Sequence, residues 1–309
     1  MKAFQFQTAK KLLKDTFDLW LDVNATRLGA ALSYYSVFSL GPMLIIAIAV
    51  AAFFFGEEAA RGEIFTQLRG IIGDAGAAAV QLLVKASTKP VSGGIAAASS
   101  LITLFIGATG VVVQLKDALN TIWGVRAKPG RTLKVFFKNY VMSIASLLGL
   151  GFILVVSLMA SAILQFLGGY IGALLPFPEQ VLALINTLFS FSMISLLFAL
   201  IFKVLPDVEI RWKDVLPAAA FTGIMFTIGK SLVGLYLGSQ SLDSSYGAAA
   251  SVVVILLWVY YLAQVLFFGA CFSKIYALHQ GQPIEVGEDV QFEKPMPPLG
   301  SPGRPTPAS

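Results

Sequence analysis

The sequence predicts an all-α, polytopic membrane protein: a bundle of six transmembrane helices with an N-terminal amphipathic helix at the membrane interface. Its 309 residues are 57% hydrophobic and only 13% charged, whereas soluble domains carry about 25% charged residues. Six apolar segments each exceed the roughly 20 residues that a helix needs to cross a hydrocarbon core. They lie near residues 32–55, 94–115, 140–167, 181–205, 215–237 and 248–275.

The positive charges alternate between the two sides of these segments. Most Lys and Arg residues fall in the N-terminal arm, the second and fourth loops and the C-terminal end, and Lys230 lies within a span. The opposite side holds four, all in the first loop: Arg61, Arg69, Lys85 and Lys89. The positive-inside rule therefore places both termini in the cytoplasm, and an even number of spans requires the same arrangement.

The net charge of +5 raises the question of a nucleic-acid partner. Because the basic residues flank apolar spans, contact with anionic lipid head groups explains them better. We therefore expect membrane lipids, and no nucleic acid, as partners. The Gly- and Ala-rich spans suit a homo-oligomer, and they equally suit tight packing within one chain.

Three regions follow from the pattern. Residues 1–28 form a cytoplasmic amphipathic helix, because apolar residues recur there at helical spacing. It lies in the membrane interface or packs beneath the bundle, and both can hold. Residues 29–280 form the six-span domain, whose first outer loop, about 57–92, suggests one or two amphipathic helices broken near Gly73 that cap the outer face.

Residues 281–309 form the third region, a Pro-rich cytoplasmic tail. It has seven prolines in the 27 residues from 283 onward and few large apolar groups. This composition predicts disorder.

The first span carries an unusual group of hydroxyls and a proline. Tyr34, Tyr35, Ser36 and Ser39 bring hydroxyl groups into the membrane, and Pro42 follows within the same span. The serines serve helix packing or a polar pathway, since serine can bond to its own helix. Pro42 makes a packing kink, or it makes a hinge or cavity wall.

Two later residues join this candidate substrate pathway. Lys230 is the charged residue deepest inside a predicted span, and it either snorkels to the interface or faces the bundle interior toward a partner. Asp243 is the nearest acid in the following loop. Gln264 lies near the middle of the last span and requires a hydrogen-bond partner, and Trp258 in the same span is expected to pack between helices.

Enzyme chemistry finds no support in the motifs. The chain has no GxxxxGK[ST] loop, no GxSxG elbow and no HExxH. One cysteine and one histidine exclude a disulfide within the chain and a Cys/His zinc site built from one chain. We expect no catalytic residues, no metal site and no cofactor. The polar run at 114–120 is interpreted as a helix end satisfied by neighbours and water.

Four segments in order carry a family resemblance: RLGAALSYYSVFSLGPML (27–44), QLKDALNTIWGV (114–125), LPDVEIRWKDVLPAAAFTGIMFTIGKSLVGLYLG (205–238) and SYGAAASVVVILLWVYYLAQVLFFGACFSKIYA (245–277). Together they resemble the YihY/BrkB family of bacterial inner-membrane proteins over about residues 10–280. The resemblance implies six helices with both termini inside and a role in transport or the envelope. The family was once labelled ribonuclease BN, and these residues do not support that activity. The family usually has a glutamate where this chain has Cys271.

The leading hypothesis is therefore a multi-pass protein of the bacterial cytoplasmic membrane that acts as a transporter or flippase-like carrier of a lipid, another amphiphile or a small solute. The alternative is a non-transporting membrane scaffold that assists envelope assembly or serum resistance.

Overall fold

The computed structural model describes residues 2–87, 110–128, 179–239, 250–281, 284–287 and 290–293. Most of these residues are helical, which confirms the helical class, and four short strands are added. The elements in chain order are α1 (Lys2–Asp22), α2 (Ala25–Phe55), α3 (Glu57–Ser87), a helix at 110–123, β1 (Val125–Ala127), α6 (Glu179–Val204), β2 (Val208–Glu209), α7 (Trp212–Ser239), α9 (Ala250–His279), β3 (Glu285–Val286) and β4 (Val290–Phe292).

The helices α2, α6, α7 and α9 cover four of the six predicted spans. The predicted span at 140–167, and most of the span at 94–115, lie outside the described residues. Within the described part of the chain, one helix is long and apolar enough to cross a membrane by length and composition: Val252–His279 in α9. The total of six spans stays a prediction.

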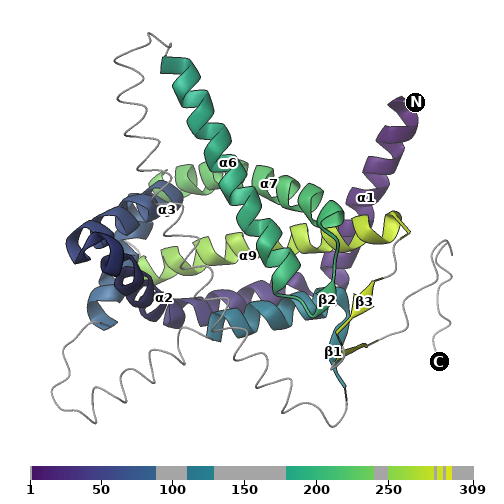
Figure 1. The fold of residues 1–309 in the computed structure, drawn as a ribbon, viewed down its shortest axis with the longest axis horizontal. Coiled ribbons are helices and arrows are strands. Elements are labelled where there is room, and N and C mark those ends of the chain that lie inside the picture. The colour runs from purple at the N-terminus through teal and green to yellow at the C-terminus, as the bar shows by residue number, and fades with distance from the viewer. Residues whose placement is uncertain are drawn as a thin grey trace.

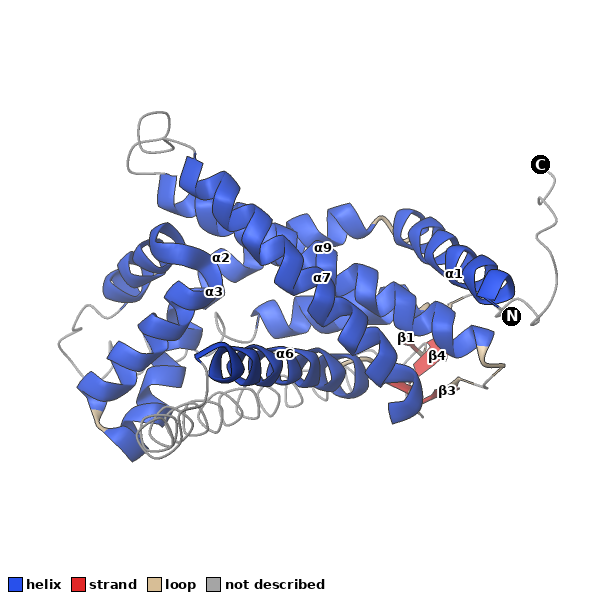
Figure 2. Ribbon diagram, turned by 90° about the horizontal axis from the view of Figure 1, so that it is seen from above, coloured by secondary structure: helices blue, strands red, loops and turns tan. Residues whose placement is uncertain are grey.

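Helix α9 forms the centre of the molecule. It packs against α1, α2, α3 and α7, and α6 packs mainly against α7 (Figure 1). Both views place α3 at one end of the bundle, and α1 and the strands at the other (Figures 1 and 2). The two ends of the bundle therefore differ in secondary structure: α3 forms one end, and α1 with the two small sheets forms the other.

Residues that tolerate a left-handed backbone separate consecutive helices. Asn24 (φ 52°, ψ 48°) stands between α1 and α2, and Gly56 (φ 83°) stands between α2 and α3. Asparagine and glycine accept this conformation at lower cost than other residues. The chain therefore passes from one helix to the next at these two positions with at most two residues between the helices.

Glycines let neighbouring helices approach closely. A methyl group added at Gly29 would lie 2.0 Å from Gln264 Nε2 of α9, so α2 and α9 meet at this position. Small residues at helix contacts permit this approach in membrane proteins. The same relation joins α7 to α6 and to α9, through the pairs Gly223–Ser195, Gly229–Tyr261 and Gly269–Thr222.

The first helix has two apolar faces. Leu19 and Trp20 pack against the main core, and Thr16 is fully buried. On another face, three apolar side chains at a spacing of four residues stay 44–51% exposed: Leu13, Phe17 and Leu21. The helix ends at Asp22, before the predicted residue 28, and its contacts accommodate both proposed positions, beneath the bundle and against a lipid surface.

The tail, which the sequence predicts to be disordered, contains two short strands, β3 (Glu285–Val286) and β4 (Val290–Phe292). β3 pairs antiparallel with β2, and β4 pairs antiparallel with β1. Val290 is only 3% exposed. We call β3, β4 and the residue Gly287 between them the C-terminal clasp. Apolar residues alternate in and next to the clasp in a way that favours strands. The prolines that flank this stretch at 283 and from 295 onward obscured the signal, which is carried by Ile284, Val286, Val290 and Phe292.

Candidate functional site: polar groups inside the bundle

The four hydroxyl-bearing residues that the sequence grouped together in α2 lie on two different faces of the helix. Ser36 and Ser39 are buried, whereas Tyr34 is 59% and Tyr35 is 45% exposed. Ser36 Oγ donates to the Leu32 carbonyl at 2.8 Å, so its hydroxyl is satisfied by its own helix. The structure thus separates Tyr34 from the serines instead of gathering all four around one path.

Tyr35 and Ser39 do meet at one neighbour. A methyl group added at Gly110 would lie 3.7 Å from both Ser39 Oγ and Tyr35 Cδ1. The helix at 110–123 therefore packs on this part of α2. Helix α2 continues through Pro42 without a break, but the side chain of Pro42 lies outside the described side chains, so the choice between kink and hinge stays open.

Gln264 ties the middle of α9 to the start of α2. Its Nε2 donates to the Ala25 carbonyl at 3.4 Å, and the amide lies directly over Gly29. Its Oε1 is buried and has no hydrogen-bond partner among the described residues. The expected hydrogen-bond partner is therefore found for one half of the amide.

Lys230 lies on the inward-facing side of α7. It follows Ala219, Gly223 and Phe226 at spacings of three and four residues, which places all four on one helical face. Ala219 and Phe226 are buried, and Lys230 is half-buried. The described residues supply no ion-pair partner for it, and the suggested partner Asp243 lies outside them.

Further buried polar atoms in α6 and α9 also have no hydrogen-bond partner among the described residues. Ser195 Oγ of α6 faces Gly223 on the side of α7 that carries Lys230. Trp258 is only 4% exposed, which agrees with its expected place inside the bundle, and the described residues give its Nε1 no hydrogen-bond partner either. Each such group costs about 1–3 kcal/mol when buried without a partner. Sequence reasoning missed Ser195 and Ser273 of α9, because serines inside apolar spans usually bond to their own helix.

A buried ion pair lies at the clasp end. Lys116 Nζ is 2.8 Å from Asp207 Oδ1, and the two side chains are only 3% and 11% exposed. Asn120 donates to Asp207 Oδ2 at 2.9 Å and accepts the Asp207 backbone N–H at 2.8 Å. The interpretation of the polar run as a satisfied helix end is confirmed for Lys116 and Asn120. Asp207, their partner, was missed.

The clasp closes over this ion pair. Gly287 N–H donates to the Asp207 carbonyl at 3.3 Å, and Glu293 N–H donates to the Gly124 carbonyl at 2.8 Å. From α9, Lys274 Nζ donates to the Ile122 carbonyl at 2.8 Å, which satisfies the end of the helix at 110–123. Some of the basic residues assigned to lipid contact therefore bind within the protein.

The described residues do not form a metal-binding site. Within the described ranges, no three His, Cys, Asp or Glu side chains are grouped so that they could hold a metal ion. Cys271, the position at which the resemblance leads one to expect glutamate, is fully buried in the main core.

Comparison with known proteins extends the sequence resemblance. A UPF0761 membrane protein of Stenotrophomonas maltophilia strain K279a is 28% identical over 273 residues, covering 87% of this chain and 62% of its own length. A UPF0761 membrane protein of Pseudomonas aeruginosa strain PAO1 is 28% identical over 248 residues, covering 78% of this chain and 56% of its own length. The chain thus spans about three fifths of the length of these curated relatives. No solved structure matches it.

Residues 16–289 match the family described as virulence factor BrkB. The match includes α2, the ion pair between Lys116 and Asp207, α9 and β3. The relatives are named membrane proteins, and α9 has the length and composition of a span. The chain is therefore a membrane protein that belongs to the BrkB family.

Proposed function

We propose that this protein is a carrier of an anionic lipid or other anionic amphiphile in the bacterial cytoplasmic membrane, with several spans and both termini on the cytoplasmic side. The observation that carries the proposal is the position of Lys230. Its cationic side chain lies on the inward face of α7, and the described residues give it no acidic partner. An intramembrane cation placed in this way is a candidate contact for an anionic head group.

The surroundings of Lys230 support a polar path. The inward face of α7 also carries Gly223, beside which the buried Ser195 hydroxyl has no partner among the described residues. Lys230 and Ser195 together offer a cation and a hydroxyl along the contact between α6 and α7. A phosphate or carboxylate head group could accept a hydrogen bond from either one, which would remove the cost of leaving that group unpaired.

The apolar surface of α7 supports an amphiphile as substrate. On the side opposite Lys230, Ile224, Ile228 and Leu232 are 50–61% exposed, as expected for side chains that face acyl chains. A substrate with a charged head and an apolar tail could place its head near Lys230 while its tail stays in lipid.

The proposal is tested in liposomes that contain the purified protein and a fluorescent anionic lipid, whose movement between leaflets is followed by chemical quenching. We expect Lys230→Met to reduce the protein-dependent rate at least about tenfold, the effect of losing one charged hydrogen bond of 1.5–3 kcal/mol. The matched control is Lys213→Met, in the exposed first turn of the same helix. Equal rates for wild type and the Lys230 variant would remove this residue from the mechanism.

A membrane scaffold is the alternative function. Because the C-terminal clasp is part of the fold, the truncation that distinguishes a carrier from a scaffold must lie beyond it. Truncation after Gly281 would remove both clasp strands and so damage the fold under either hypothesis. Truncation after Glu293 keeps the clasp and removes the Pro-rich residues that a scaffold would use for docking. A carrier should keep its transport rate after this cut, whereas a scaffold should lose its function.

A further inference from the structure

The two ends of α3 line the same cavity. Arg61 and Lys85 both border a cavity of about 470 Å³, although a straight helix would separate residues 24 positions apart by about 36 Å. Helix α3 is continuous from Glu57 to Ser87, so it must bend back on itself between these residues. The sequence has four glycines between them, and three of these, at positions 70, 73 and 76, lie in the middle of the helix.

The bend is anchored on the bundle from both arms. Ile64 of the first arm and Val80 and Val84 of the second are at most 2% exposed. All three belong to one apolar cluster with residues of α2 and α9. The two arms therefore lie beside each other, and both pack on α2 and α9.

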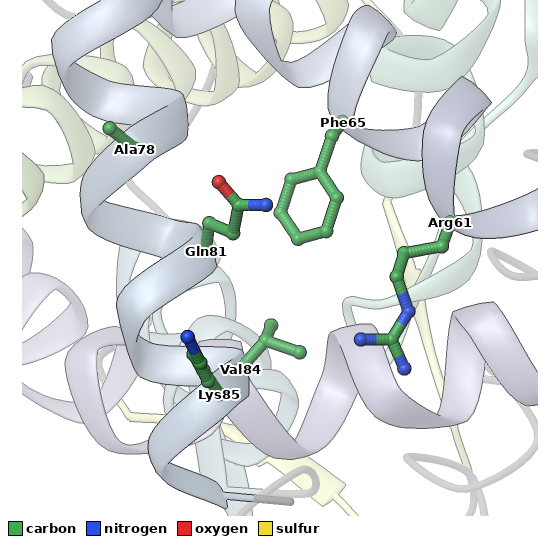
Figure 3. Close-up of a pocket in the computed structure, with 6 residues that line it drawn as sticks. All are labelled: Arg61, Phe65, Ala78, Gln81, Val84 and Lys85. Carbon is green, nitrogen blue, oxygen red and sulfur yellow. The ribbon is translucent and has the colours of Figure 1, made fainter. Parts of the chain in front are cut away.

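Cationic side chains border this cavity from both arms. Figure 3 shows Arg61 and Phe65 on one arm and Gln81 and Lys85 on the other. Arg61, Gln81 and Lys85 supply hydrogen-bond donors, while Phe65 and the buried Val84 supply apolar surface. Arg61 also pairs with Glu57 at 3.0 Å, and this pair is exposed to solvent. The lining combines positive charge with an apolar wall, in a volume within the usual range of ligand pockets.

We propose that the bend of α3 is a binding site for a phosphate-bearing ligand, which Arg61 and Lys85 clamp from opposite arms. Guanidinium groups bind phosphate oxygens in a bidentate manner, and lysine adds a second point charge. Phe65 and Val84 contact the apolar part that carries the phosphate. The site goes beyond the proposed transport: it lies at the opposite end of the bundle from the clasp, and it requires no movement of the ligand across the membrane.

The experiment is equilibrium binding to the full-length protein in a non-ionic detergent, measured by titration calorimetry with two separate probes. One probe is glycerol 3-phosphate, and the other is short-chain phosphatidylglycerol, which carries a phosphate diester with acyl chains. Binding of the lipid alone assigns the site to a phospholipid head group. Binding of glycerol 3-phosphate, with or without the lipid, assigns it to a soluble phosphate ester.

Four variants of exposed residues on α3 decide whether the clamp is specific. Arg61→Gln and Lys85→Gln should each weaken binding of the active probe about tenfold or more. Glu57→Gln removes the carboxylate that competes for Arg61 and should strengthen binding about two- to fivefold. Arg69→Gln, on α3 but not part of the cavity lining, should leave the affinity unchanged.

Three results would overturn the site. The first is no binding of either probe, and the second is equal affinity in all variants. The third is an equal loss in the Arg69 and Arg61 variants, which would indicate only diffuse attraction to positive charge. Circular dichroism of each variant checks that the helices remain folded. Because transport is not measured here, failure of this site leaves the proposal for Lys230 standing, and the reverse also holds.

Discussion

The clasp end and the α3 end of the bundle are held by different kinds of contact. At the clasp end, a buried ion pair, two hydrogen bonds between Asn120 and Asp207 and two small sheets join segments that are far apart in sequence. At the α3 end, Ile64, Val80 and Val84 pack on α2 and α9, and the Arg61–Glu57 pair stays within its own helix. Directional bonds fix one geometry, whereas packed apolar surfaces can slide by small amounts. We therefore expect the clasp end to act as the fixed base and the α3 end to move first.

The largest expected effect comes from breaking the buried ion pair. Asp207→Ala leaves Lys116 charged and buried without its partner, and we expect it to destabilise the protein by about 3–5 kcal/mol. The free energy of unfolding is measured by SDS titration in mixed micelles. The double variant Lys116→Met with Asp207→Leu should recover most of this loss, because it removes both charges. A single variant as stable as wild type would contradict the idea of a fixed base.

Removing the clasp should have the next largest effect. Truncation after Gly281 exposes the apolar surface that Val290 covers and removes the backbone bonds to Asp207 and Gly124. We expect a loss of about 2–4 kcal/mol in the same assay. The control is truncation after Glu293, which should change stability by less than about 0.5 kcal/mol. Similar losses for both cuts would place the stabilising contacts beyond the clasp.

A substitution in the apolar cluster at the α3 end tests whether this end opens independently of the clasp end. Val84→Ala removes buried methyl groups from the cluster on α2 and α9, and we expect a loss of about 1–3 kcal/mol. Hydrogen exchange followed by mass spectrometry should show faster exchange in α3 and no change in the helix at 110–123. Equally faster exchange at both ends would show that the ends open together, against the proposed difference between them.

The smallest effects are expected at two exposed ion pairs, one at each end. Arg126 and Glu293 are 3.8 Å apart, and both side chains are 57% exposed. Arg126→Gln and Arg61→Gln should each change stability by less than about 0.5 kcal/mol, because water screens both pairs. Thermal unfolding followed by circular dichroism measures this. A large shift from only one of them would mean that an exposed charge contributes to holding that end.

The helices were predictable because their signals are local. Apolar length predicted the positions of α2, α6, α7 and α9. Periodicity predicted α1 and the helical structure of α3, although α3 is continuous through Gly73, where a break was expected. The ion pair was not predictable, because Lys116 and Asp207 are separated by 91 residues and each looked like an ordinary loop charge. The clasp was missed because its few alternating apolar residues are followed by a Pro-rich stretch.

The candidate path was predictable only in part, for a related reason. A lysine or a glutamine inside an apolar span is conspicuous, so Lys230 and Gln264 could be named from the sequence. Ser195 could not, because a serine there carries no sign of whether its hydroxyl bonds to its own helix. Nor does the hydropathy pattern say which way a helix turns its faces, which is why Tyr34 was grouped with the buried serines.

The burial of Cys271 has a practical consequence. It is the one cysteine of the chain, and it is 0% exposed, so thiol reagents have no native target while the protein is folded. A cysteine introduced on α1 or α3 can therefore report, through membrane-impermeant maleimides, on which side of the membrane each end lies. In the unsubstituted protein, labelling of Cys271 itself measures how often the core opens. The buried Cys271 thiol therefore does not interfere with topology mapping by introduced cysteines, and its own labelling rate reports how fast the core unfolds.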